Sequence, residues 1–132
     1  MLHLKLAADP RWVDVAAMNI EDILIDHAYC EMKAASTCIS LINSFPDRTE
    51  LVEKLMPVVT EEWGHFRQVV KELNNRGFEL GKQRKDQYVN KLLEFSKKGG
   101  SREDFLLEKL LISALIEARS CERFKVLSEN IK

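Results

Sequence analysis

The chain has 132 residues, of which 45% are hydrophobic and 31% charged, and its formal net charge is −1. That length can bury a core, and five glycines and three prolines are too few for a collagenous or disordered chain. It has no run of eighteen apolar residues to span a bilayer and no long apolar segment near residue 1 to act as a secretory signal. We therefore expect one cytoplasmic, non-membrane domain over residues 1–132.

The first two predicted helices are long. Leucine occurs seventeen times and threonine three times, and apolar residues recur every three or four positions, so the chain is predicted to be helical throughout. The first helix is expected from about Trp12 to about Asn43, and residues 44–47 supply the turn that ends it. The second is expected from Thr49, whose hydroxyl offers a cap, to residues 74–77. Pro57 lies inside it and predicts a kink.

The segment from residue 76 to residue 102 is basic. It carries eight basic and three acidic side chains, so its net charge is +5 against −6 for the remainder. A shorter helix is expected within it, from about Asp86 to Lys98, closed by the glycine pair at residues 99–100. Because nucleic-acid binding can depend on local positive charge, this segment is a candidate phosphate-binding surface, although a solvated helix with its loops explains it equally well.

The last predicted helix runs from about Arg102 to the end of the chain. Ser101 with Asp104 resembles a capping box, with Asp in place of the usual Glu. Three long helices and one short helix predict an all-α bundle. The three cysteines, which include no C-x-x-C pair, predict reduced and buried thiols at Cys30, Cys38 and Cys121.

Four polar residues interrupt the apolar seams of the long helices. Glu31 lies in the seam of the first helix, Glu62 and His65 in that of the second, and Glu122 in that of the last. The apolar members are, helix by helix, Leu24, Ala28, Ala35, Cys38 and Ile42; Leu51, Leu55, Val58, Phe66, Val69 and Leu73; and Leu107, Leu111, Leu115, Ala118 and Val126.

Carboxylates that converge in a core need a shared positive charge, because burying an ionised carboxylate alone is costly. A metal ion supplies that charge. Glu62 and His65 lie about one turn apart on one helix face and suit one cation. Carboxylate-rich ligands with one imidazole per metal favour iron or manganese over zinc. Ferritin-like bundles use this set, with one Glu from each of two helices and a Glu-x-x-His pair from each of two others.

A weak internal repeat relates residues 25–31 to residues 116–122. It places Glu31 and Glu122 in equivalent positions and favours Glu122 over Glu117 as a ligand. Two duplicated helix pairs would also place a second Glu-x-x-His roughly thirty residues beyond Glu122, whereas the sequence ends at Lys132. We therefore expect four of six protein ligands here, in a truncated bundle or one that takes the missing ligands from elsewhere.

Four segments together resemble the tRNA-(2-methylthio-isopentenyladenosine) hydroxylases, and the resemblance covers nearly the whole chain. They are DHAYCEMKAA at residues 26–35, EEWGHF at 61–66, NRG at 75–77 and IEARSCERF at 116–124. The resemblance implies a ferritin-like, non-haem di-iron monooxygenase. Such an enzyme uses dioxygen and two electrons to hydroxylate the isopentenyl side chain of a hypermodified adenosine beside the anticodon of tRNA.

The resemblance also assigns roles to residues. It maps Glu31, Glu62, His65 and Glu122 onto ligands of two iron ions, with Glu62 as the bridge between them, and it implies an electron donor as partner. The family's fourth core helix is missing from this chain. A three-helix remnant would expose one apolar seam, so self-association is expected.

Several alternatives remain open at this point. Glu62 and His65 are also compatible with a surface ion pair, and Glu61 replaces Glu62 if the helix is rotated. His27, one turn before Glu31, is either a structural histidine or a partner of a metal ligand. The competing function is a non-catalytic, ferritin-like bundle that binds metal or handles iron.

Overall fold

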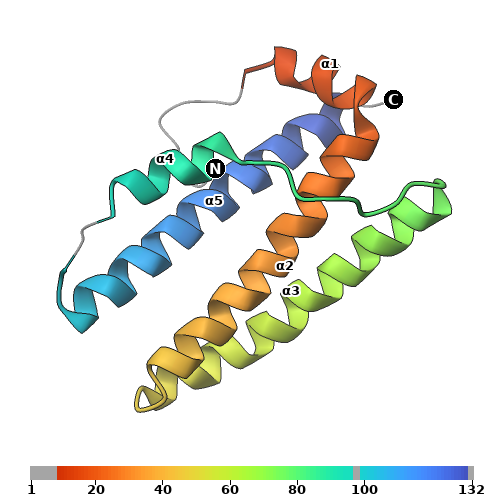
Figure 1. Cartoon of the computed structure of the whole chain (residues 1–132). Helices are drawn as coiled ribbons and strands as arrows, with labels where there is room; N and C mark the ends of the chain where they lie inside the picture. The colour runs from red at the N-terminus through yellow and green to blue at the C-terminus, as the bar shows by residue number, and fades with distance from the viewer. Residues whose placement is uncertain (1–8, 97–98, 131–132) are drawn as a thin grey trace. The chain divides into compact units, whose positions relative to one another are not determined.

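The computed structural model describes residues 9–96 and 99–130. Within these ranges the regular structure is helical: α1 (Arg11–Met18), α2 (Ile20–Ser44), α3 (Thr49–Asn75), α4 (Gln87–Glu94) and α5 (Arg102–Asn130) (Figure 1). None of the helices described has the length and apolar character to cross a membrane. The chain divides into two compact units, which are residues 20–84 and residues 1–19 with 85–132. A single domain over all 132 residues stays a prediction.

The segment predicted as the first helix forms two helices, α1 and α2, because the helical hydrogen bonding is interrupted at Asn19. In a continuous helix the carbonyl of Val15 accepts from the backbone N–H of residue 19. Here the Asn19 side-chain amide donates to that carbonyl at 2.7 Å, and the Asn19 N–H donates to Ala16 instead. Asn19 has φ −133° and ψ 46°, outside the helical region. A short amide side chain has therefore replaced a backbone donor, and the prediction of one helix from Trp12 to Asn43 was wrong.

Helices α2 and α3 form an antiparallel hairpin and make up most of the first unit (orange and yellow-green in Figure 1). The turn between them ends α2, because Pro46 has no N–H to donate and disfavours a helical conformation at Phe45. Phe45 is 1% exposed and closes this end of the hairpin core. The other buried residues of the hairpin are Ala28, Ala35 and Leu41 from α2 and Leu55 and Leu73 from α3.

The ends of α3 agree only partly with the prediction. Thr49 is the first helical residue, not the cap: Arg48 holds the cap position, without a side-chain cap hydrogen bond. Pro57 lies within α3, and the helix continues through it. At the other end Gly77 has φ +77°, which a residue with a Cβ rarely adopts, and the Phe78 N–H donates to the Leu73 carbonyl. Glycine therefore terminates α3 as predicted.

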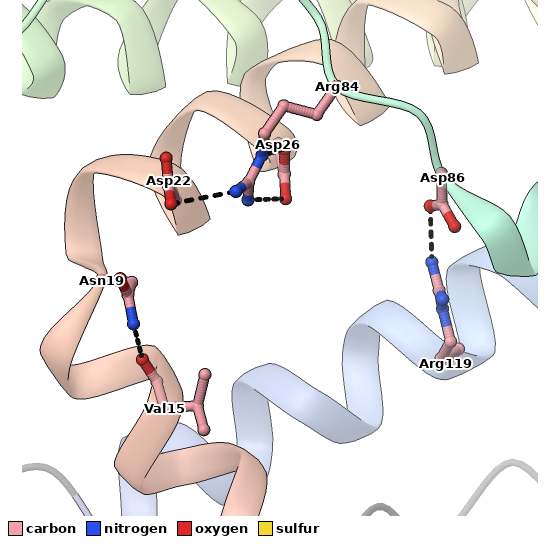
Figure 2. Close-up of polar contacts among 7 residues, drawn as sticks. All are labelled: Val15, Asn19, Asp22, Asp26, Arg84, Asp86 and Arg119. Atoms are coloured by element: carbon pink, nitrogen blue, oxygen red, sulfur yellow. Dashed lines mark hydrogen bonds and ion pairs between the residues drawn. The ribbon is translucent and has the colours of Figure 1, made fainter.

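The segment after α3 returns along α2 and is held to it by side chains. The Tyr29 hydroxyl donates to the Gly81 carbonyl at 2.6 Å. The Arg84 guanidinium lies 2.9 Å from Asp22 and 2.7 Å from Asp26, and Figure 2 shows it between the two carboxylates. Residues 81–84 are thus fixed against the N-terminal half of α2.

In the second unit α4 and α5 both begin at side-chain caps. Asp86 accepts from the N–H groups of Tyr88 and Val89, so it caps α4. Ser101 and Asp104 bond to each other's backbone N–H at 3.1 and 3.2 Å, which confirms the predicted capping box. Helix α4 ends at Glu94, short of the predicted end, and Lys98 lies outside the described residues.

Helix α5 contacts α1 and α4. Arg119 ties α4 to α5, because its guanidinium lies 2.9 Å from the Asp86 carboxylate and 3.9 Å from the centre of the Tyr88 ring (Figure 2 shows the ion pair). Among the residues of this unit that the structure describes, the buried ones are Val13, Ala16 and Leu127.

The apolar seam predicted for α5 is exposed in the first half of the helix. Leu107, Leu111 and Leu115 are 55%, 55% and 41% exposed. All three cysteines lie outside disulfides: Cys30 and Cys38 are half-buried, whereas Cys121 is exposed, which corrects its predicted burial.

Candidate metal centre

Three of the four predicted ligands meet between α2 and α3. Glu31 lies near the middle of α2, and Glu62 and His65 lie one turn apart on α3. Because the hairpin is antiparallel, the midpoint of one helix faces the midpoint of the other. Each of the three residues offers one donor atom, and these atoms all lie within 4.8 Å of one another. Helical spacing and the hairpin turn together account for this convergence.

The two carboxylates are more buried than the imidazole. The side chains of Glu31 and Glu62 are 13% and 15% exposed, and that of His65 is 43% exposed. The Nδ1 atom of His65 lies 3.5 Å from Glu31 Oε2 and 3.7 Å from Glu62 Oε2. The donor oxygens of Glu31 and Glu62 lie within 4.8 Å of each other, and two negative charges that close together repel each other where little water is present. A cation bound between the two carboxylates would lower their electrostatic energy.

A second histidine adjoins the group on α2. His27 Nε2 lies 3.2 Å from Glu31 Oε1, one helical turn away along α2, and the His27 side chain is 22% exposed. Burial lowers the pKa of His27, the neighbouring His65 lowers it further, and the negative charge of Glu62 opposes both effects. The distance between His27 Nε2 and Glu31 Oε1 allows a hydrogen bond from the imidazole N–H to the carboxylate.

The donor set fits a divalent cation of intermediate hardness. Two carboxylates supply oxygen donors and one imidazole supplies nitrogen, a combination that suits iron or manganese. The close approach of two mostly buried carboxylates is itself unfavourable without a positive charge. The half-exposed His65 leaves one side of the group open to solvent.

The sequence also named Glu122 as a ligand, with Glu117 and Glu61 as alternatives. Glu122 is half-buried on α5, in the other unit, and its role as a ligand stays a prediction. Glu117 on the same helix is exposed, and so is Glu61, the alternative to Glu62. Asp26, five residues before Glu31 on α2, is paired with Arg84.

The basic segment is partly neutralised by local ion pairs. Arg76 binds Glu72 at 2.6 Å, and Arg84 binds two carboxylates of α2. Lys82, Lys85 and Lys91 are exposed. Lys97 and Lys98 lie outside the described residues. The lysines, more than the arginines, therefore remain candidates for phosphate contacts.

The sequence left the role of His27 open and did not predict that of Arg84. The contact between His27 and Glu31 has a signal, the i,i+4 spacing, but that spacing suits a purely structural histidine as well. The contact between Arg84 and Asp26 joins residues 58 positions apart, and no local pattern indicates it.

These features define an all-α protein of the ferritin-like class, in which Glu and Glu-x-x-His side chains from adjacent helices gather between them. A solved structure, protein 43 with aldehyde deformylating oxygenase activity from Synechococcus, matches with a TM-score of 0.90 at 34% identity and confirms the predicted fold class. The match covers 96% of this chain and 62% of that one.

The family model described as tRNA-(MS[2]IO[6]A)-hydroxylase (MiaE) matches residues 2–132. The chain belongs to this family, as its sequence motifs predicted.

Two curated relatives carry the same name, tRNA 2-(methylsulfanyl)-N(6)-isopentenyladenosine(37) hydroxylase. The protein from Pseudomonas putida is 35% identical over 116 residues, a match that covers 88% of this chain. The protein from Salmonella typhimurium is 24% identical over 158 residues, with 83% of this chain covered. The chain spans 56% and 57% of the lengths of these two proteins.

Proposed function

We propose that the chain is part of a tRNA-modifying di-iron monooxygenase that hydroxylates the isopentenyl side chain of 2-methylthio-isopentenyladenosine beside the anticodon. The observation that carries the proposal is the Glu31, Glu62 and His65 group, found in a chain whose family model carries the name of that hydroxylase. Glu31, Glu62 and His65 would hold iron, and Glu122 would be a further ligand.

The proposed reaction balances as a monooxygenation. One oxygen atom of dioxygen enters a carbon–hydrogen bond of the isopentenyl group as a hydroxyl. The other leaves as water, with two electrons from a reductant and two protons. Iron supplies the dioxygen activation that side chains alone cannot supply.

The contribution of the protein is to hold and shape the site. The two carboxylates are 13% and 15% exposed, so they offer charge in a place that largely excludes water. The hairpin core on either side of them, which includes the fully buried Leu73, fixes the spacing of α2 and α3. The half-exposed His65 supports the choice of this side of the group as the approach for dioxygen and substrate.

Binding of the tRNA would draw on the exposed lysines of the basic segment. Lys82 and Lys85 flank Arg84, whose own charge is directed toward α2. Phosphate contacts by lysine are independent of sequence and weaken with salt. The anticodon loop is the proposed partner, with an electron donor as the second.

The test is a reconstitution assay. The purified chain is loaded with ferrous iron under anaerobic conditions, and iron per chain is measured. It is then given tRNA that carries the unhydroxylated nucleoside, isotopically labelled dioxygen and a reductant. The proposal expects bound iron and one labelled oxygen atom in the nucleoside by mass spectrometry, both lost in a Glu62→Ala variant. Bound iron without a labelled product would contradict the hydroxylase function for this chain.

The second candidate function is metal binding without hydroxylation. It is favoured by the number of donors, because the group described contains three side chains whereas a ferritin-like two-metal site uses six. In the same assay this function predicts no more than one metal ion per chain and no oxygen transfer. A second metal ion per chain would argue against it.

A further inference from the structure

We propose that His27 is a positioning residue for Glu31: its Nε2–H holds one carboxylate oxygen and thereby directs the other toward the metal. The inference rests on the proposed metal-binding function and goes beyond it, because His27 is not one of the proposed ligands. The His27 side chain touches no substrate in this scheme and acts only through the carboxylate it contacts.

The two carboxylate oxygens of Glu31 lie near different histidines. Oε1 lies 3.2 Å from His27 Nε2, on the same helix, whereas Oε2 lies 3.5 Å from His65 Nδ1, on the opposite helix. Oε2 is also buried, with almost no surface in contact with solvent. One oxygen of Glu31 is therefore directed along α2 and the other toward the residues of α3.

The position of His27 follows from helix geometry. Residues four apart lie on the same face, and a side chain at the earlier position reaches the later one across a single turn. His27 is 22% exposed and Glu31 13%, so their contact is shielded from competing water. A hydrogen bond formed in that setting restricts the rotation of the carboxylate and leaves a single oxygen available to a cation.

Four variants separate hydrogen bonding from packing. His27→Leu and His27→Phe remove the donor and keep an apolar side chain, one branched and one a flat ring. His27→Gln and His27→Asn keep an N–H donor. His65→Gln is the reference for the loss of a ligand. The probe is Mn²⁺ added alone to the metal-free chain, with affinity measured by calorimetric titration and folding checked by circular dichroism.

The proposal predicts that the affinity for Mn²⁺ depends on an N–H donor at residue 27 and not on the size of the side chain there. His27→Leu and His27→Phe should each weaken Mn²⁺ binding by about 10- to 100-fold, which is the usual effect of losing a partner of a metal ligand. At least one of His27→Gln and His27→Asn should restore most of the affinity. Infrared difference spectra should show a changed carboxylate stretch on Mn²⁺ binding in the donor-free variants, which a packing role would not produce.

Three results would overturn the proposal. If wild type binds Mn²⁺ and the folded donor-free variants bind it equally well, only the positioning role fails. If His27→Gln and His27→Asn are as weak as His65→Gln, His27 is itself a ligand. If wild type binds no Mn²⁺, the proposed metal-binding function fails together with the inference. Failure of one apolar variant to fold leaves the other apolar variant to decide.

Discussion

The substitution Glu62→Gln should stabilise the metal-free chain while it weakens metal binding. The donor oxygens of Glu31 and Glu62 lie within 4.8 Å of each other, and both side chains are at most 15% exposed. At an effective dielectric constant of about 20, two unit charges at that distance repel by about 3 kcal/mol. The contact of Glu62 with His65 offsets part of this repulsion, so the expected gain in the free energy of unfolding is about 1 kcal/mol.

The assay is thermal unfolding with and without Mn²⁺. In the presence of a chelator, Glu62→Gln should unfold roughly 3–5 °C above wild type. With Mn²⁺ the order should reverse, because the variant loses a charged donor and binds the ion at least about tenfold more weakly. Glu61→Gln is the matched control: it is the same chemical change one residue away, at an exposed position, and should shift neither value.

One result would refute this reasoning. If metal-free Glu62→Gln is less stable than wild type while Glu61→Gln is unchanged, the charge of Glu62 is stabilised by its contact with His65 alone. The group would then be a structural ion pair, and the argument that these carboxylates need a metal would fail.

Three further predictions follow from the packing and charges of the chain. Leu73→Ala, at a fully buried position, should lower the free energy of unfolding in urea by about 2–5 kcal/mol, whereas Leu107→Ala, at a position 55% exposed, should change it by less than about 0.5 kcal/mol; similar losses would mean that the hairpin core is not the stable part. Burial raises the pKa of Asp86, but hydrogen bonds from Val89, Arg119 and Tyr88 outweigh it and leave the pKa below the ordinary 3.8. The cap is therefore fully present above pH 3.8 and lost as the pH falls through the lower folded value, so Asp86→Ala should cost about 1 kcal/mol at neutral pH and nothing in strong acid; a difference that persists in acid would contradict this. Charge reversal at Lys82 and Lys85 should weaken tRNA binding and lower the slope of log K against log salt by about one per lost phosphate contact, and an unchanged slope would exclude these lysines from the interface.

The helices were predictable from the sequence because their boundaries depend on local chemistry. Gly77 terminates α3 and Ser101 with Asp104 begins α5, both through bonds that span at most a few residues. The break at Asn19 was missed, because helical periodicity does not show whether an amide side chain will compete for a carbonyl. The apolar seam of α5 shows a second limit, because periodicity identifies an apolar face but not what covers it.

The part of the candidate site that lies within the hairpin was predictable from the sequence. Glu31, Glu62 and His65 could be named because helical spacing decides which residues share a face, and two seams of a hairpin must face each other. Glu122 lies on a helix of the other unit, so its role as a ligand stays a prediction. Arg84 belongs to the basic segment considered as a phosphate-binding surface, and it binds two carboxylates of α2 through a contact that depends on the path of the chain after α3.

The hairpin combines a stable end and an electrostatically costly middle. Phe45 and Leu73 are almost fully buried toward its opposite ends, and between them two carboxylates occupy positions where leucines would pack better. Replacing such a group by apolar residues is often neutral or stabilising, so stability alone does not explain its presence. A ligand that binds the folded chain at 100 times its dissociation constant adds about 2.7 kcal/mol to stability, which is comparable to the repulsion between the two carboxylates. The free energy of metal binding would therefore offset most of the stability that the repulsion between Glu31 and Glu62 costs the folded hairpin.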